Sequence, residues 1–492
     1  MKETFTKRYL LVFVMLLGGV TLFAQPANYW SNSFNSEASL LGGAVVGGGS
    51  NITSIYYNPA NIAEIKESNI AFNSSLFKLQ YEKYDNAFGD ERTVSNPVFK
   101  VEPRFASLIL RPKKHPKISW QMAVFSRDFY SLYLYDTYSE SAKKLGLAAS
   151  GTYSGSFNLR GTYSDYWAGL GASYQINDHL YMGFSLLGSL KNMYYTNRRQ
   201  TVLEQSGNEL QFANRQDLSV WSAYDWINFW DIRMLVKIGL RYKLKNTSFG
   251  LNLTSPSVKI MGYAHLKLEH SYLNIVDNQG EPIPNFIEQY AADYVYCQVK
   301  DPFSASFGIT HYQPEKKQQF YFSTEFFAGL KPYKMIDPTR GHSLFADVVT
   351  DSPKATIYYG NKPILNIGFG YLKKLKPEFE IMFGFKTDFN SYNIPKSFIR
   401  DNSESIFKQY VSSDLYHLSG GANFIFLNKL KINTGLELTY GQNNSNRQFI
   451  NFTDIKWYNP EDNTALQGLR GNDMDYSTLN IGLFFGFTYI FK

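Results

Sequence analysis

The side chains that could do chemistry in this chain are few and scattered. Seven histidines are spread over the sequence, and none forms the HExxH pair that binds zinc on a helix. No GxSxG turn is present to expose a serine nucleophile. Cys297 is the single cysteine, so neither a disulfide nor a thiolate pair for structural zinc can form. The sequence therefore predicts a protein that is not an enzyme, with no catalytic residue, metal or cofactor.

Two motifs could bind a charged ligand, and both are incomplete. Asn472-Asp473-Met474-Asp475 offers oxygen ligands for calcium, but the other ligands of an EF-hand are missing, so an ordinary loop is the simpler interpretation. Residues 40–64 begin with a glycine-rich run, as a phosphate-binding loop would. The run lacks GxGxxG spacing and no Gly-Lys-Ser/Thr follows, which argues against phosphate.

The glycine-rich run is better explained as a compact segment in a confined space. Glycine tolerates positive φ angles and close backbone contact, which suits a tightly folded plug. The glycines are Gly42, Gly43, Gly47, Gly48 and Gly49. Asn58-Pro59 then turns the chain, because the residue before a proline is pushed out of the helical region. A plug requires a hollow body around it, which the remaining chain must supply.

The composition allows one large barrel. Of the 492 residues 17% are aromatic, with 37 Tyr and 39 Phe, as is usual for a membrane barrel with aromatic girdles. The mean hydropathy of −0.29 argues against a bundle of apolar transmembrane helices. It does not argue against a barrel, because only alternate barrel residues face lipid.

The first 24 residues have the features of a secretory signal peptide. Lys2, Lys7 and Arg8 form a basic start, residues 9–23 are apolar, and Ala24 precedes the expected cleavage. Loss of residues 1–24 removes three basic residues and one acidic residue, so the net charge changes from +7 to 46 − 41 = +5. This mild excess does not indicate nucleic-acid binding.

From about residue 69 to the C-terminus, apolar and polar residues alternate. In the last segment the odd positions from 479 to 491 are all apolar, whereas positions 478, 480, 482, 486 and 488 are polar or glycine. About fourteen such segments predict an all-β fold, a transmembrane antiparallel barrel of about 14 strands. The expected strands are 69–83, 100–112, 117–136, 155–175, 180–205, 230–244, 247–272, 301–312, 318–330, 363–374, 377–390, 413–426, 430–443 and 476–491.

The connections between these strands alternate between long and short. Outer-membrane barrels have short periplasmic turns and long external loops, so this rhythm predicts that both termini are periplasmic. Fourteen strands would leave a hole along the axis, because only a barrel of about eight strands is filled by its own side chains. We therefore expect a plug, or hatch, at 25–66 inside a barrel at 67–492, in the outer membrane of a Gram-negative cell.

The plug resembles the N-terminal hatch of the FadL family, the outer-membrane transporters of long-chain fatty acids. The match consists of Gly47, Gly48 and Gly49 followed by the aromatic-Asn-Pro-Ala turn at residues 57–60, Tyr57, Asn58, Pro59 and Ala60. The stretch from Gly250 to Pro256 resembles the family's mid-barrel strand with its Ser-Pro break. The resemblance implies a porin-like channel for passive uptake of hydrophobic small molecules such as long-chain fatty acids. The alternative it leaves open is a receptor or scaffold that serves secretion-machine proteins.

Two long loops at 206–229 and 273–300 carry apolar residues at helical spacing. In the first, Asp217 could cap a helix whose face holds Val220, Trp221, Tyr224 and Ile227. In the second, Asn285 could cap a helix whose face holds Phe286, Ile287, Tyr290, Ala291 and Tyr294. The resemblance implies that such loops form a groove that captures substrate. An interfacial girdle, or packing within the loops, is the other interpretation.

The third expected strand contains an irregularity. Apolar residues occupy alternate positions at Trp120, Met122 and Val124. Ser126-Arg127-Asp128 then places two adjacent charges in the middle of the strand. A bulge here would turn both charges away from lipid and open a lateral exit. Alternatively, the strand simply enters the headgroup region at Arg127.

Inward-facing charges on the strands predict a network in the lumen. They are Glu325, Glu380, Lys386, Asp388, Lys431 and Glu437. Such a network would anchor the plug, or one of its cations would hold a substrate carboxylate. The expected partners are outer-membrane lipid, lipopolysaccharide and a hydrophobic ligand, and the chain is expected to be a monomer.

Overall fold

The computed structural model describes residues 28–30, 36–49, 52–143, 151–204, 218–277, 279–340, 342–343, 355–393, 413–426, 429–460 and 463–491. The expected signal peptide lies outside the described residues. No helix among the described residues is long and apolar enough to cross a membrane.

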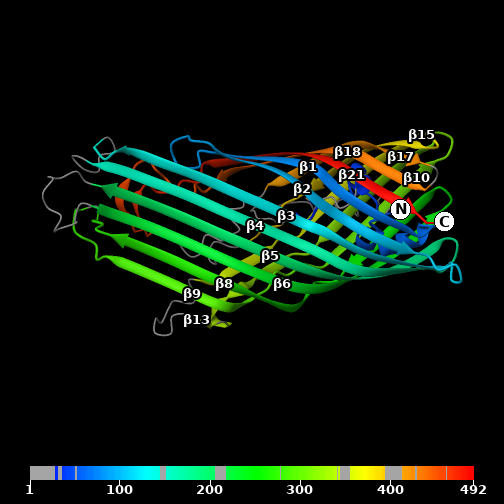
Figure 1. Ribbon diagram of the computed structural model, residues 1–492, viewed down its shortest axis with the longest axis horizontal. Coiled ribbons are helices and arrows are strands. Elements are labelled where there is room, and N and C mark those ends of the chain that lie inside the picture. Colours follow the sequence, from blue (N-terminus) through cyan, green and yellow to red (C-terminus); the bar gives the residue numbers. More distant parts are fainter. Residues whose placement is uncertain are drawn as a thin grey trace, which may run out of the picture.

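Fourteen antiparallel strands close into a ring, as the alternation predicted (Figure 1). In ring order they are β1 (Asn69–Asp85), β2 (Val94–Leu110), β3 (Ile118–Ser141), β4 (Thr152–Gln175), β5 (Leu180–Glu204), β6 (Leu218–Leu244), β7 (Thr247–Thr254), β10 (Ser304–Gln313), β11 (Gln318–Phe327), β15 (Ile364–Lys376), β16 (Phe379–Asp388), β17 (Asp414–Phe426), β18 (Leu430–Asn446) and β21 (Met474–Ile490). β21 pairs along its length with β1, which closes the ring. The polypeptide backbone thus satisfies its own hydrogen bonds around the ring, which a membrane requires.

Further strands extend the wall where a ring strand is interrupted and then continues. β8 (Val258–Leu273) continues β7 after the Ser-Pro break and pairs with β6 and β9 (Phe286–Cys297). β12 (Leu330–Asp337), β13 (His342–Ser343) and β14 (Ile357–Asn361) extend the neighbouring wall. β19 (Lys456–Asn459) and β20 (Thr464–Gln467) form a separate hairpin.

The structure corrects the prediction of two loop helices. Residues 218–227 belong to β6 and residues 286–294 belong to β9, so both expected helices are wrong. Asp217, the expected cap of the first, lies outside the described residues. Asn285 accepts a hydrogen bond from the Asn274 backbone nitrogen (2.7 Å) and precedes a strand. The aromatic spacing that suggested helices comes from strands with apolar residues on both faces.

The two faces of the strands meet different environments. On β5, exposed apolar side chains point outward at Met182, Phe184, Leu186, Leu190 and Tyr194, and inward-facing residues between them are buried or nearly so. Beyond Tyr194 the outward residues become polar, with Arg198 and Gln200. An outward apolar band of this kind is what faces lipid in a membrane barrel.

Short turns gather at one end of the barrel and long connections at the other. Among the short turns are residues 245–246 and 377–378, and among the long connections are 447–473 and 274–285. The first and last strands meet at the short-turn end, where the Phe491 backbone nitrogen donates to the Ser68 carbonyl (2.8 Å). Figure 1 shows the end of β21, in red, at this end of the barrel. We call these the short-turn end and the long-loop end.

The hatch folds inside the barrel at the short-turn end. It contains α2 (Ser36–Leu40), α3 (Ser54–Tyr57) and the 3₁₀ helix η1 (Pro59–Glu64). Asn58 has an extended backbone, with φ −162° and ψ 105°, as a residue before proline should. Its side-chain oxygen caps η1 by accepting from Ala60, and its amide nitrogen donates to the Val46 and Leu240 carbonyls (2.9 and 3.1 Å). Asn58 therefore joins two halves of the hatch to β6.

Glycines in the wall form the seat of this hatch. A Cβ at Gly183 on β5 would collide with Pro59, and one at Gly239 on β6 would collide with Asn58. Other wall glycines whose Cβ would meet hatch atoms are Gly171, Gly250, Gly308, Gly368, Gly370, Gly384, Gly421 and Gly435. The glycines on inward faces thus remove side chains where two backbones approach closely.

The predicted lumen charges mostly contact the hatch. Trp30 donates its backbone nitrogen to Asp388 (2.9 Å) and its indole nitrogen to Glu325 (2.8 Å), and its carbonyl accepts from Lys386 (2.6 Å). Lys431 pairs with Glu37 at 2.7 Å. Of the other two, Glu380 accepts from Asn423, and Glu437 pairs with Lys386 and His417. The contacts of Trp30 and Glu37 fix the hatch to three strands, β11, β16 and β18.

Candidate functional site

The wall of the barrel is interrupted between β2 and β3. Their ladder begins at Leu110 opposite Trp120 and ends at Phe105 opposite Phe125. Beyond this point β2 pairs only with β1, and β3 pairs only with β4. We call this unpaired stretch the seam.

The sequence of β2 explains why the ladder stops. Pro97 and Pro103 lie within its unpaired part and have no N–H to donate to β3. Toward the long-loop end, the Asn96 side chain bonds to the backbone of β3 in place of the ladder. It donates to the Ser131 carbonyl (3.3 Å) and accepts from the Tyr133 nitrogen (3.1 Å). The seam is therefore bounded by Phe105 at one end and by Asn96 at the other.

A bulge lies on β3 at the seam. The β3–β4 register shifts between Ser126 and Asp128, and Phe125 and Ser126 are buried in succession, which breaks the alternation. Arg127 lies with its guanidinium 5.2 Å from the Trp167 ring centroid and 3.5 Å from Asp165. The charge thus points into the barrel, away from lipid.

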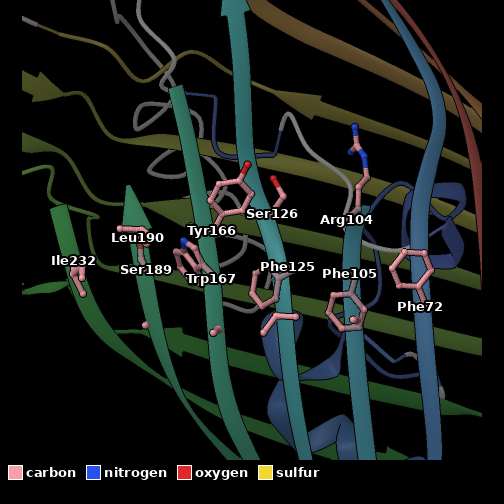
Figure 2. Close-up of a pocket in the computed structure, with 14 residues that line it drawn as sticks. Phe72, Arg104, Phe105, Phe125, Ser126, Tyr166, Trp167, Ser189, Leu190 and Ile232 are labelled. Carbon is pink, nitrogen blue, oxygen red and sulfur yellow. The ribbon is translucent and has the colours of Figure 1, made fainter. Parts of the chain in front are cut away.

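An apolar pocket of about 520 Å³ occupies this part of the wall. It is lined from both faces: Val124, Tyr166 and Leu190 are exposed on the outside, whereas Phe125 and Trp167 are buried inside. Figure 2 shows Phe105 and Phe125 on neighbouring strands, with Arg104 and Ser126 above them. The pocket therefore lies at the start of the seam.

The inner side of the pocket is closed by the hatch. Tyr56 packs edge-on against Phe125 (5.7 Å between centroids) and Trp167 (5.8 Å). Behind it, the Lys237 ammonium lies 4.2 Å from the Tyr56 ring centroid and donates to Thr254 (3.1 Å). No carboxylate of the described residues is within ion-pair distance of Lys237. A molecule entering through the seam would meet Tyr56 first and this cation next.

Inward-facing residues form three layers along the barrel axis. On β4, Tyr163 belongs to the apolar core at the long-loop end, Trp167 to the hatch core, and Asp165 lies between them. The same order recurs on β5 (Met193, Lys191, Leu187) and on β6 (Phe229, Asp231, Leu235).

The middle layer is a buried ionic network. Lys191 contacts Asp165 (2.7 Å) and Asp301 (3.0 Å), and Arg233 pairs with Asp231 (3.2 Å). Breaking a buried ion pair is costly, so this layer opposes passage of an apolar molecule along the axis. The pocket in the wall lies beside this layer.

The predicted groove residues do not come together on one surface. On β6, Trp221 and Ile227 face the core, whereas Val220 and Tyr224 are half-buried on the other face. On β9, Ile287 and Tyr294 are exposed, Tyr290 is buried and Phe286 is half-buried. The two sets therefore divide between the interior and exterior of the wall, because a strand turns alternate side chains to opposite faces.

Residues at the seam were missed by the sequence reasoning. Asn96 and Pro97 were expected in a loop, because the second strand was expected to begin at 100, whereas it begins at Val94. Pro103 was expected in the strand but was not identified as a break. Two prolines in a strand of a membrane barrel were the available signal, since proline is confined to edges and bulges.

Among the described residues, no group of three or more His, Cys, Asp or Glu side chains is arranged to hold a metal ion. The fold instead defines the class of protein: a closed fourteen-strand transmembrane barrel with a folded hatch and an opening in its wall.

Solved structures of other proteins share this fold. No protein-family model matches the chain, and no curated protein matches it significantly. A Pseudomonas aeruginosa FadL homologue of known structure is 13% identical with a TM-score of 0.53, over 95% of this chain and 100% of that chain. The Pseudomonas putida toluene transporter TodX is also 13% identical, with a TM-score of 0.53, over 94% of this chain and 98% of that chain. The chain thus has the fold of these barrels, as the hatch resemblance predicted.

Proposed function

We propose that this protein is an outer-membrane channel that passively admits hydrophobic small molecules and passes them between its lumen and the membrane through the β2–β3 seam. The observation that carries this proposal is the interrupted ladder, beside an apolar pocket that is lined by residues of both faces of the wall. The two similar structures, a FadL homologue and a toluene transporter, support the substrate class.

The energetics favour a sideways route. A hydrocarbon chain gains roughly 0.8 kcal/mol for each CH₂ that leaves water. On the axial route it would have to pass the Asp165–Lys191 layer and then displace the hatch. On the sideways route it passes between aromatic side chains into lipid.

Uptake into liposomes tests the proposal. The purified protein should accelerate entry of a fluorescent fatty acid and of a neutral aromatic hydrocarbon over protein-free liposomes. The same acceleration by a matched β-barrel without a seam would show that the effect is unspecific. No acceleration of either compound would contradict the proposal.

Lys237 is expected to separate acidic from neutral substrates. A fatty-acid carboxylate that reaches Tyr56 can pair with the Lys237 ammonium, and a charge-assisted hydrogen bond contributes about 1.5–3 kcal/mol. Lys237→Met should therefore lower fatty-acid uptake by roughly tenfold or more and leave hydrocarbon uptake unchanged. Lys243→Met, in the same strand at the short-turn end, is the control. Equal loss for both substrates would instead indicate damage to the hatch.

The orientation is also a proposal. If the short-turn end is periplasmic, a tag in the external turn around Gly280 should be labelled on intact cells. A tag at the 245–246 turn should be labelled only after the outer membrane is permeabilised. Labelling in the reverse order would invert the topology.

A further inference from the structure

The long connection between β18 and β21 enters the mouth of the barrel. Its buried residues include Ile450, Phe452 and Leu466, none of which is exposed to solvent. We call residues 447–460 and 463–473 the cap. The cap supplies part of the apolar core at the long-loop end.

The cap crosses the mouth to the opposite wall. It starts at the end of β18 and ends at the start of β21, yet the Ala465 carbonyl accepts from Thr201 on β5 (3.0 Å) and the Leu466 carbonyl accepts from Tyr153 on β4 (2.8 Å). The Asn463 carbonyl accepts from the Trp221 indole on β6 (3.4 Å). β6 lies nearly opposite β21 in the ring. Figure 1 shows this orange-red segment among the long-loop ends of the cyan strands.

The cap is held to the wall by aromatic stacking and single hydrogen bonds. Phe452 stacks on Phe88 (5.8 Å) and on Tyr138 of β3 (5.5 Å), and its backbone nitrogen donates to the Phe88 carbonyl (2.9 Å). Gly155 on β4 leaves room for its ring, because a Cβ there would collide with it. A loop that docks through side chains and isolated hydrogen bonds can leave without breaking the barrel ladder.

The cap also joins the two sides of the seam. Arg92, in the β1–β2 turn, lies 5.3 Å from the Phe452 ring centroid and 5.0 Å from that of Tyr138 on β3. Its guanidinium also pairs with Asp136 on β3 at 2.8 Å. Arg92 thus ties the β2 side of the seam to β3, and Phe452 of the cap packs against this tie.

From these contacts we infer that the cap is an outer gate, in series with the hatch, and that its departure both admits substrate from the long-loop end and loosens the seam. This inference rests on the proposed function. Substrate that displaces Phe452 removes a ring from the cluster around Arg92, so the mouth and the seam open together.

A tether tests the gate. Thr201→Cys and Ala465→Cys, in a chain carrying Cys297→Ala, would be joined by oxidation to a disulfide, because the two positions are buried against each other. The control bridges Gln200→Cys to Ser222→Cys, a pair on the outer face of the same wall that does not touch the cap. The bridged cap should lose uptake to the rate of protein-free liposomes, while the control pair keeps it.

The outcomes separate the two proposals. Uptake by the unbridged double-cysteine protein confirms that it folds and that the proposed function holds. If that protein transports and the bridged cap transports equally fast, the gate is wrong. If the unbridged proteins and the parent do not transport at all, it is the proposed function that is wrong. A spin-label pair at Val101→Cys and Phe129→Cys should also report a narrower distance distribution across the seam when the cap is bridged through an orthogonal linkage.

Discussion

Deleting both the hatch and the cap is expected to produce a large, stable conductance in planar bilayers, whereas deleting either one is expected to leave the pore nearly closed. The two segments fill separate layers of the same lumen, the hatch at the short-turn end and the cap at the long-loop end. Obstructions in series must both be removed before ions can pass. A fourteen-strand ring without filling is wide enough to hold water.

The deletions can be made without disturbing the wall. Residues 25–66 precede the first strand, and every strand of the ring pairs without them. In the cap, the Gly468 nitrogen donates to the Asn451 carbonyl (3.0 Å), so a short Gly-Ser bridge between these two residues can replace 452–467. Heat-modifiable migration on a denaturing gel checks that each variant is a folded barrel. Full conductance after deletion of the hatch alone would show that the cap does not seal the mouth.

The ring itself could be predicted from the sequence because a membrane barrel enforces alternation. Each strand of the β15–β16 hairpin, for example, turns Phe369 and Phe385 to lipid and places Gly368 or Lys386 inside. The hatch could be predicted because Asn58-Pro59 and the glycine run have a backbone requirement that a confined turn meets.

The two loop helices and their groove were predicted wrongly because the alternation fails beyond the membrane. In residues 218–229 the inward side of β6 packs in the core at the long-loop end, and its outward side carries Tyr224 and Trp226. When both faces of a strand are apolar, the alternation of apolar and polar residues is lost. Apolar residues can then fall at helical spacing by chance. Interior packing decides between the two, and it depends on the distant cap.

The seam was predicted from one side only. The adjacent charges at Arg127-Asp128 indicated an irregularity in β3, and the register shift lies there. On the other strand, Pro97 was not recognised because the expected strand began at 100, and Pro103 lay inside the expected strand without being taken as a break in its pairing. Partners across a seam are set by three-dimensional register, which neither strand reveals alone.

Closing the seam is expected to abolish uptake. Val101→Cys on β2 and Phe129→Cys on β3, in a chain carrying Cys297→Ala, would be bridged across the unpaired stretch by a short bismaleimide. The matched control bridges Leu108→Cys to Met122→Cys, which are already paired on the same two strands below the opening. Both proteins keep the hatch, the cap and Lys237, so only the side opening differs.

The decisive measurement is the initial rate of hydrophobic-substrate entry into liposomes that contain each bridged protein, compared with its unbridged form. The lateral route predicts that bridging the seam reduces the rate to that of protein-free liposomes, while bridging the control pair leaves it unchanged. Equal rates before and after the seam is bridged would contradict the route and leave the barrel axis as the only path.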